Sequence, residues 1–94
     1  MSDHVVSIDN TSSSDNWIVN TSDINITVAC DQGQGGKFSV NLQPGERKRV
    51  AWNVSAHPYP YGLQKYDDFE YSLNKSETWE VRKEAGKLIL FKVS

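Results

Sequence analysis

The sequence predicts an all-β fold, an antiparallel β-sandwich of about seven to eight short strands in a single domain spanning 1–94. Three observations predict it. Apolar and polar residues alternate in most short segments, which is the period of a strand with one buried face. Turn-forming residues recur every several positions, and no stretch has a helical period longer than about one turn. The length supports one modest core, of immunoglobulin-like or jelly-roll-like architecture.

The first half of the chain contains the clearest alternation. Residues 4–8 and 17–19 are expected to form short strands with a polar loop between them. The strand at 24–30 should bury one side and expose a polar outer side. Its buried side is expected to consist of Ile24, Ile26, Val28 and Cys30. A glycine-rich turn at 32–36 then leads to an antiparallel partner at 37–42.

A tight turn at Pro44 and Gly45 opens the second half, because proline presets φ and glycine accepts a positive φ. Val50, Trp52 and Val54 then alternate with small or polar residues. This alternation predicts one continuous strand with Trp52 in the core.

The last third of the chain is expected to form three strands, at 69–73, 79–82 and 87–93. Trp79 is in phase with Val81, so we expect it to pack in the core. Residues 88–91 are apolar on both faces, as in a strand near the centre of a sheet or at a sheet-to-sheet contact.

One segment interrupts this rhythm. Residues 56–68 contain Pro58, Pro60 and Gly62, which we expect to prevent continuous ladder pairing, and they are rich in aromatic rings. We therefore predict a loop that forms a contact surface. The residues predicted to bind the ligand are His57, Tyr59, Tyr61, Tyr66, Asp67 and Asp68 on this loop, together with Trp17 outside it.

These residue types fit carbohydrate recognition, because rings stack on the C–H faces of sugars while carboxylates accept bonds from hydroxyls. The leading prediction is a non-enzymatic, soluble, lectin-like binding module. The alternative is a protein-protein interaction domain, an inhibitor or an immunoglobulin-like adhesion module, which uses the same tyrosines or an edge strand. A second alternative is a membrane-active β-sandwich toxin with its aromatic loop at the bilayer interface. The tyrosines could also merely cover an open end of the sandwich.

Charge and hydropathy exclude other classes of partner. The formal net charge is −2 and the sequence pI is about 5.6, so nucleic-acid binding is not expected despite the basic run at 47–49. No apolar run approaches the roughly 18 residues of a transmembrane segment. The partner is thus expected to be a glycan or a protein ligand. Homo-oligomerisation stays open, since weak single glycan sites gain from multivalency.

No cofactor, metal or catalytic site is predicted. His57 could act as a base oriented by Asp67 or Asp68, with Ser55 nearby, but no nucleophile motif accompanies them. The adjacent carboxylates Asp67, Asp68 and Glu70 do not follow the spacing of a calcium loop, and the two histidines lack metal-ligand spacing.

Cysteine and asparagine usage bear on the compartment. Cys30 is the only cysteine, so no internal disulfide forms, and its alternation predicts a buried thiol. No leader is visible at the start of the sequence, which favours an intracellular protein. A secreted protein is the alternative because of N-x-S/T sequons, which otherwise reflect polar residues on the wet faces of strands. The sequons lie at Asn10, Asn20, Asn25, Asn53 and Asn74.

Two short segments resemble immunoglobulin-like sandwiches. Leu42, Pro44 and Gly45 are similar to a turn common in those domains. The alternation of Asp67, Phe69, Tyr71 and Leu73 is similar to their tyrosine-corner strand, with leucine where the second cysteine would stand. The resemblance implies a sandwich fold, and no family is assigned from it.

Overall fold

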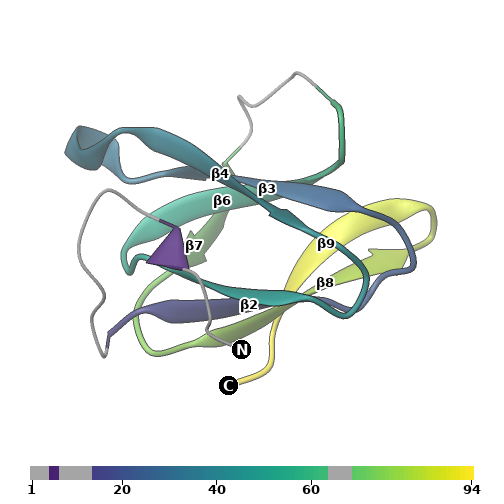
Figure 1. The fold of residues 1–94 in the computed structure, drawn as a ribbon. Coiled ribbons are helices and arrows are strands. Elements are labelled where there is room, and N and C mark those ends of the chain that lie inside the picture. Colours follow the sequence, from purple (N-terminus) through teal and green to yellow (C-terminus); the bar gives the residue numbers. More distant parts are fainter. Residues whose placement is uncertain (1–4, 7–13, 64–68) are drawn as a thin grey trace.

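The computed structural model describes residues 5–6, 14–63 and 69–94, which form two β-sheets packed face to face (Figure 1). The five-stranded sheet has the spatial order β1 (Val5–Val6), β5 (Arg47–Val50), β2 (Asn16–Asn20), β8 (Thr78–Glu84) and β9 (Lys87–Lys92). The four-stranded sheet has the order β4 (Lys37–Leu42), β3 (Ile26–Asp31), β6 (Val54–Pro60) and β7 (Tyr71–Leu73). A single 3-10 turn, η1 (Gly33–Gly35), links β3 to β4. The predicted all-β sandwich is confirmed.

Most neighbouring strands are antiparallel, as predicted, but two pairs in the five-stranded sheet are parallel. β2 is antiparallel to β5 on one side and parallel to β8 on the other, and the short β1 is parallel to β5. β2 therefore joins strands from distant parts of the chain.

The core lies between the two sheets, and the alternating apolar positions of β3 face it as predicted. The opposite face of β3 differs from the prediction, because Thr27 and Ala29 are almost completely buried as well. β3 is an inner strand with β4 and β6 on either side, and the Thr27 hydroxyl donates a hydrogen bond to Asn41 Oδ1 (2.7 Å). Asn41 and Tyr59 pair with Thr27 from the two neighbouring strands, so their side chains lie beside it on a face that the sequence predicts to be solvated.

Cys30 is fully buried in this core, which confirms the predicted buried thiol. Burial raises the pKa of its thiol to about 12. The reactive thiolate is therefore scarce near neutral pH, and the side chain acts as a small apolar group.

The predicted continuous strand through Val50, Trp52 and Val54 is wrong. β5 ends at Val50 and β6 begins at Val54, and the two strands belong to opposite sheets. Asn53, between them, has a φ of 55° and helps to turn the chain from one sheet to the other. Both valines reach the core, but Trp52 is 45% exposed and not a core residue. Trp79 does pack against the core, as predicted.

The predicted loop from residue 56 is also wrong in its first part, because β6 continues through Pro58 and Pro60 in register with β3. The N–H of Tyr61 donates to the carbonyl of Asn25, just before β3 (3.1 Å). The N–H direction alternates along a strand, so both proline nitrogens face away from β3. The missing donors therefore cost the ladder no hydrogen bond.

The last strand, β9, lies at the edge of its sheet and not at the centre. Leu88 and Leu90 face the core, whereas Phe91 on the other face is 44% exposed. The guanidinium of Arg82 lies 3.7 Å from the centre of the Phe91 ring. An arginine thus covers part of the second apolar face, and the contact of β9 with β6 of the other sheet matches the alternative expectation of a sheet-to-sheet contact.

The turn predicted at Pro44 and Gly45 is confirmed. Gly45 has a φ of 82°, and the N–H of Glu46 donates to the carbonyl of Gln43 (2.9 Å). Glycine accepts this positive φ without the strain that a side chain would add.

Asn20, at the end of β2, is completely buried although the sequence places it in a polar segment. Its Nδ2 donates to the carbonyls of Ile24 (2.8 Å) and Leu42 (3.1 Å), and its Oδ1 accepts from the N–H and hydroxyl of Ser22. The amide nitrogen that a glycan would need is thus occupied and inaccessible. The wet-face interpretation of the sequons is wrong for Asn20.

Candidate functional site

A cleft of about 610 Å³ opens between the edges of the two sheets. One wall is formed by residues 57–60 of β6 together with Glu70 and Tyr71. The other wall is the β8–β9 hairpin, including Lys83 and Lys87. The hairpin and the distal end of β6 lie toward the same end of the sandwich (Figure 1). The volume of the cleft lies within the roughly 300–1,000 Å³ of small-ligand sites.

The β6 wall ends in a strand edge with unusual hydrogen-bonding capacity. β7 pairs with β6 from Val54 to Ala56, and no described residue pairs with the edge beyond, which we call the open edge. Pro58 and Pro60 have no N–H to present there. The carbonyl of a strand residue points to the same side as its nitrogen, so Pro58 directs an acceptor toward the open edge. The edge offers acceptors without neighbouring N–H donors.

Three rings pack together beside this edge. The His57 ring lies 4.9 Å from Tyr59 and 5.9 Å from Tyr71, measured between ring centres. Tyr71 in turn lies 6.4 Å from Trp79 in an edge-on arrangement. Tyr59 is only 7% exposed and His57 is half-buried. The rings are therefore held by packing in the cleft wall.

A carboxylate stands next to the ring cluster. Glu70 is largely exposed, and its Oε1 lies 3.5 Å from His57 Nδ1. That ring nitrogen is buried and has no hydrogen-bond partner among the described residues. Glu70 thus places an acceptor at the mouth of the cleft, where ligand hydroxyls could reach it.

The structure divides the predicted site residues. His57 and Tyr59 line the cleft, whereas Tyr61, 62% exposed, lines a different hollow of about 400 Å³ near Asn25 and Asn41. The remaining loop residues predicted to bind lie outside the described residues; these are Tyr66, Asp67 and Asp68.

Trp17, the other predicted stacking platform, lies on β2 away from the cleft. The guanidinium of Arg47 is 4.4 Å from its ring centre, and that of Arg49 is 5.8 Å away. Part of the basic run at 47–49 therefore packs against this ring by cation–π contact. These arginines occupy the stacking surface that a sugar would need.

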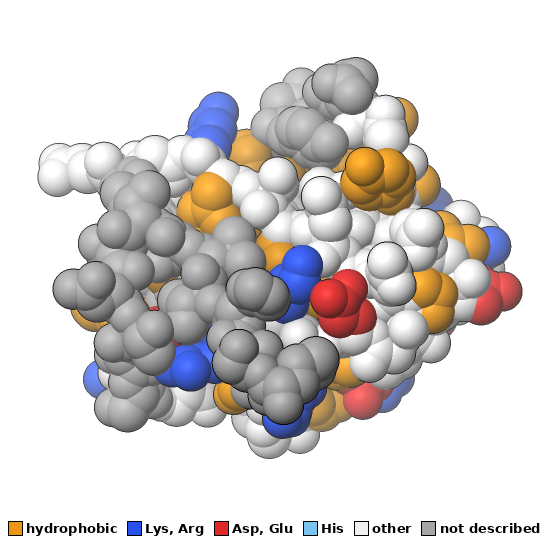
Figure 2. Space-filling view, viewed as in Figure 1, with side chains coloured by type: hydrophobic (Ala, Val, Ile, Leu, Met, Phe, Trp, Pro, Cys, Tyr) orange, Lys and Arg blue, Asp and Glu red, His pale blue; other side chains and the backbone are white. Residues whose placement is uncertain are grey.

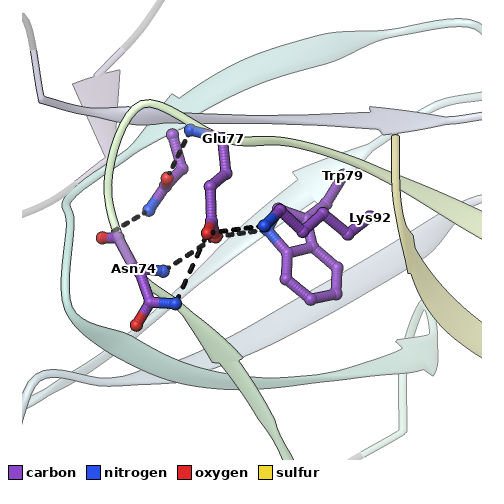
Figure 3. A network of polar contacts seen from close by, with 5 residues as sticks. Asn74, Glu77, Trp79 and Lys92 are labelled. Atoms are coloured by element: carbon purple, nitrogen blue, oxygen red, sulfur yellow. Dashed lines mark hydrogen bonds and ion pairs between the residues drawn. The ribbon is translucent and has the colours of Figure 1, made fainter. Parts of the chain in front are cut away.

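A polar network lies elsewhere, around the buried carboxylate of Glu77 (Figure 3). Its oxygens accept hydrogen bonds from the Asn74 backbone N–H (2.9 Å), the Asn74 side-chain amide (3.4 Å) and Trp79 Nε1 (3.0 Å), and Lys92 Nζ lies 3.2 Å away. Asn16 accepts from the N–H of Glu77 (2.9 Å). The network ties β2, the β7–β8 turn and the end of β9 together.

The pKa of Glu77 reflects opposing causes. Burial of the carboxylate raises its pKa, but the hydrogen bonds from Asn74 and Trp79 and the contact with Lys92 lower it. The net result is a pKa below the ordinary value. Since every oxygen of this carboxylate is engaged within the protein, we assign the network to stability and not to ligand binding.

Four polar or aromatic cleft residues were not among those predicted to bind: Glu70, Tyr71, Lys83 and Lys87. Tyr71 alternates with Leu73, so the sequence predicts it as an ordinary strand residue. The lysines flank a hairpin turn, where charges are common. Only the packing of the hairpin opposite β6 brings them to the cleft, and no local sequence signal reports it.

The described residues contain no group of three or more histidine, cysteine or acidic side chains placed to hold a metal ion. No helix in the same part of the chain is long and apolar enough to cross a membrane. No protein-family model, curated protein or solved structure matches this chain.

Proposed function

We propose that this chain is a non-enzymatic carbohydrate-binding module and that the cleft between β6 and the β8–β9 hairpin holds the sugar. One observation carries the proposal. The same wall combines packed rings, of His57, Tyr59 and Tyr71, with the exposed carboxylate of Glu70 and a strand edge rich in acceptors. No catalytic role is assigned to these groups.

The chemistry of sugars matches both parts of this wall. A pyranose ring has apolar C–H patches that pack on aromatic rings, here His57 and Tyr71. It also has many hydroxyls that donate hydrogen bonds. Glu70 and the carbonyl of Pro58 are acceptors, and bonds to a charged acceptor such as Glu70 are the stronger ones.

The same edge is a poor site for a peptide. A peptide that adds to a sheet as a strand needs alternating N–H donors and carbonyl acceptors from the edge. Pro58 and Pro60 supply no donors, and proline on an edge opposes strand addition. The proline edge therefore favours a hydroxyl-rich ligand over a peptide strand in this cleft.

A glycan-array screen tests the proposal, with wild-type protein beside His57→Ala, Glu70→Gln and Tyr61→Ala. We expect a specific signal that weakens about tenfold or more in the first two variants, because each loses a contact worth about 1.5 kcal/mol or more. Tyr61→Ala is the matched control, since this exposed ring follows β6 directly but lies outside the cleft. It should bind like wild type.

Two results would contradict the proposal. One is a blank array from protein whose thermal unfolding shows it to be folded. The other is a signal that Tyr61→Ala abolishes and Glu70→Gln leaves intact, which would move binding to the other hollow. Glu70 is exposed, so its variant should fold even if His57→Ala does not.

A second function, protein binding, is favoured by the edge strand β9. Phe91 is 44% exposed and Val93, just beyond the strand, is 41% exposed. Such an edge is suited to strand addition. On the face in Figure 2, the described apolar side chains form small separate patches and not one broad surface. This function predicts a protein partner that free sugar does not displace and that Phe91→Lys loses.

A further inference from the structure

The basic side chains of the described residues fall into two groups. Four have a carboxylate partner within the chain, and the other five have none among these residues; the pairs are Lys48 with Glu46, Arg49 with Asp15, Arg82 with Glu80, and Lys92 with Glu77. Lys83 and Lys87 both line the cleft, and neither makes an ion pair or hydrogen bond within the described residues. Among the described residues, these two lysines of the cleft therefore have no carboxylate that neutralises them.

The position of Lys83 is informative because it faces inward. Along β8 it shares a face with Val81, which lies in the core, and it pairs with Leu88, which packs against the core. An apolar residue would continue this inner face. The last inward-facing position of the strand is instead Lys83, whose exposed side chain lies at the gap between the sheets, opposite the wall that contains Glu70.

Lys87 lies at the rim of the same cleft, on the outer face of β9, where it pairs in register with Glu84. It is the first residue of β9, directly after the turn at Ala85 and Gly86. Across the cleft, Glu70 is the acidic residue, and His57 lies next to it. The described part of the lining thus has two lysines and one carboxylate, a local excess of positive charge in a chain whose formal net charge is −2.

We propose that the ligand of this cleft is an acidic sugar, one whose carboxylate or sulfate is bound by Lys83, with Lys87 close by at the rim. This inference rests on the proposed carbohydrate-binding function. Lysine provides a point charge with three donors, which suits either kind of anion. A ligand that brings the missing negative charge gains attraction from both lysines, and salt should weaken it. Glu70 and Pro58 remain available to its hydroxyls.

The experiment compares one glycan in three forms, with a neutral hydroxymethyl, a carboxylate and a sulfate at the same position. Binding is measured at low and high salt for wild type, Lys83→Gln, Lys87→Gln and Lys75→Gln. Lys75→Gln is the matched control, because Lys75 is exposed and lies outside the cleft, and its substitution removes the same charge.

We expect an acidic form to bind about tenfold more tightly than the neutral form, as for one charged hydrogen bond. Lys83→Gln should remove most of this preference and leave the neutral form within about twofold of wild type. Lys75→Gln should change neither. Comparing the affinities of the carboxylate and sulfate forms shows which of the two anions the cleft prefers.

The possible failures are distinguishable. Neutral and acidic forms that bind equally, with a signal still dependent on Glu70, would overturn the acidic ligand but keep carbohydrate binding. A preference for acid that Lys75→Gln lowers as much as Lys83→Gln would also overturn the inference. If no glycan binds at all, both the proposed function and this inference fail.

Discussion

Two buried asparagines, Asn16 and Asn20, fix the two ends of β2. Each has an amide that donates to two backbone carbonyls and an oxygen that accepts from the backbone. A hydrogen-bonded amide inside a core costs little, but removing it leaves several buried groups unsatisfied. These side chains therefore act as fixed connections between strands, although asparagine at a strand end ordinarily predicts an exposed turn.

Asn20→Ala tests this role. We expect the free energy of unfolding to fall by about 3 kcal/mol, because the carbonyls of Ile24 and Leu42 and the N–H of Ser22 lose their partner. Denaturant unfolding measures the change. The matched control is Asn25→Ala at an exposed position, which should shift stability by no more than about 0.5 kcal/mol. Equal effects of the two substitutions would contradict the assigned role.

The Glu77 carboxylate makes stability depend on pH in the acid range. Its folded-state pKa is lowered, so its contribution is present above the unfolded-state pKa of about 4.3 and is lost as the pH falls through the lower folded-state value. Unfolding free energies measured between pH 6 and pH 2 should decrease in that window. Glu77→Gln should be less stable at pH 6 and should flatten the decrease. An unchanged slope in the variant would exclude Glu77 as a source of the pH dependence.

At the scale of elements, alternation predicted strands well but not where a strand passes from one sheet to the other. Val50 and Val54 are both core residues, so the pattern across Trp52 is that of one strand. The break depends on the backbone at Asn53 and on which sheet receives each half. Neither is visible in the order of apolar residues.

A pair of tryptophan substitutions tests this correction. Trp79→Ala should lower the free energy of unfolding by about 3 kcal/mol, since the ring packs on the core and its Nε1 donates to Glu77. Trp52→Ala should cost no more than about 1 kcal/mol, because its side chain is nearly half exposed. Thermal or denaturant unfolding of both variants gives the comparison. If Trp52→Ala lowered the free energy of unfolding more than Trp79→Ala, the result would contradict an exposed Trp52 and favour the continuous strand.

The prolines of β6 show a second limit of local patterns. Pro58 and Pro60 suggested a loop, yet both nitrogens face the open edge and the strand continues past them. The two prolines are two residues apart, so the sequence shows that their nitrogens point to the same side of the strand. It does not show whether that side faces β3 or the open edge. That orientation converts an apparent loop into one wall of the cleft.

At the scale of the whole molecule, composition and alternation sufficed for the two-sheet sandwich, and strand order did not follow from them. The parallel pairing of β2 with β8 and the edge position of β9 depend on contacts between distant segments. For the same reason, of the predicted site residues that the structure describes, His57 and Tyr59 lie in the cleft and Tyr61 and Trp17 do not. The lysines of the opposite wall lie more than twenty positions away in the chain.

Amide chemical-shift mapping of isotope-labelled protein during titration with the best-bound glycan tests most directly whether this cleft binds sugar. The proposed site predicts shifts at His57, Tyr59 and Tyr71 on one wall and at Lys83 and Lys87 on the other, with little change at Tyr61. Shifts centred on Tyr61 and Asn41, or no shifts with any glycan tested, would contradict it.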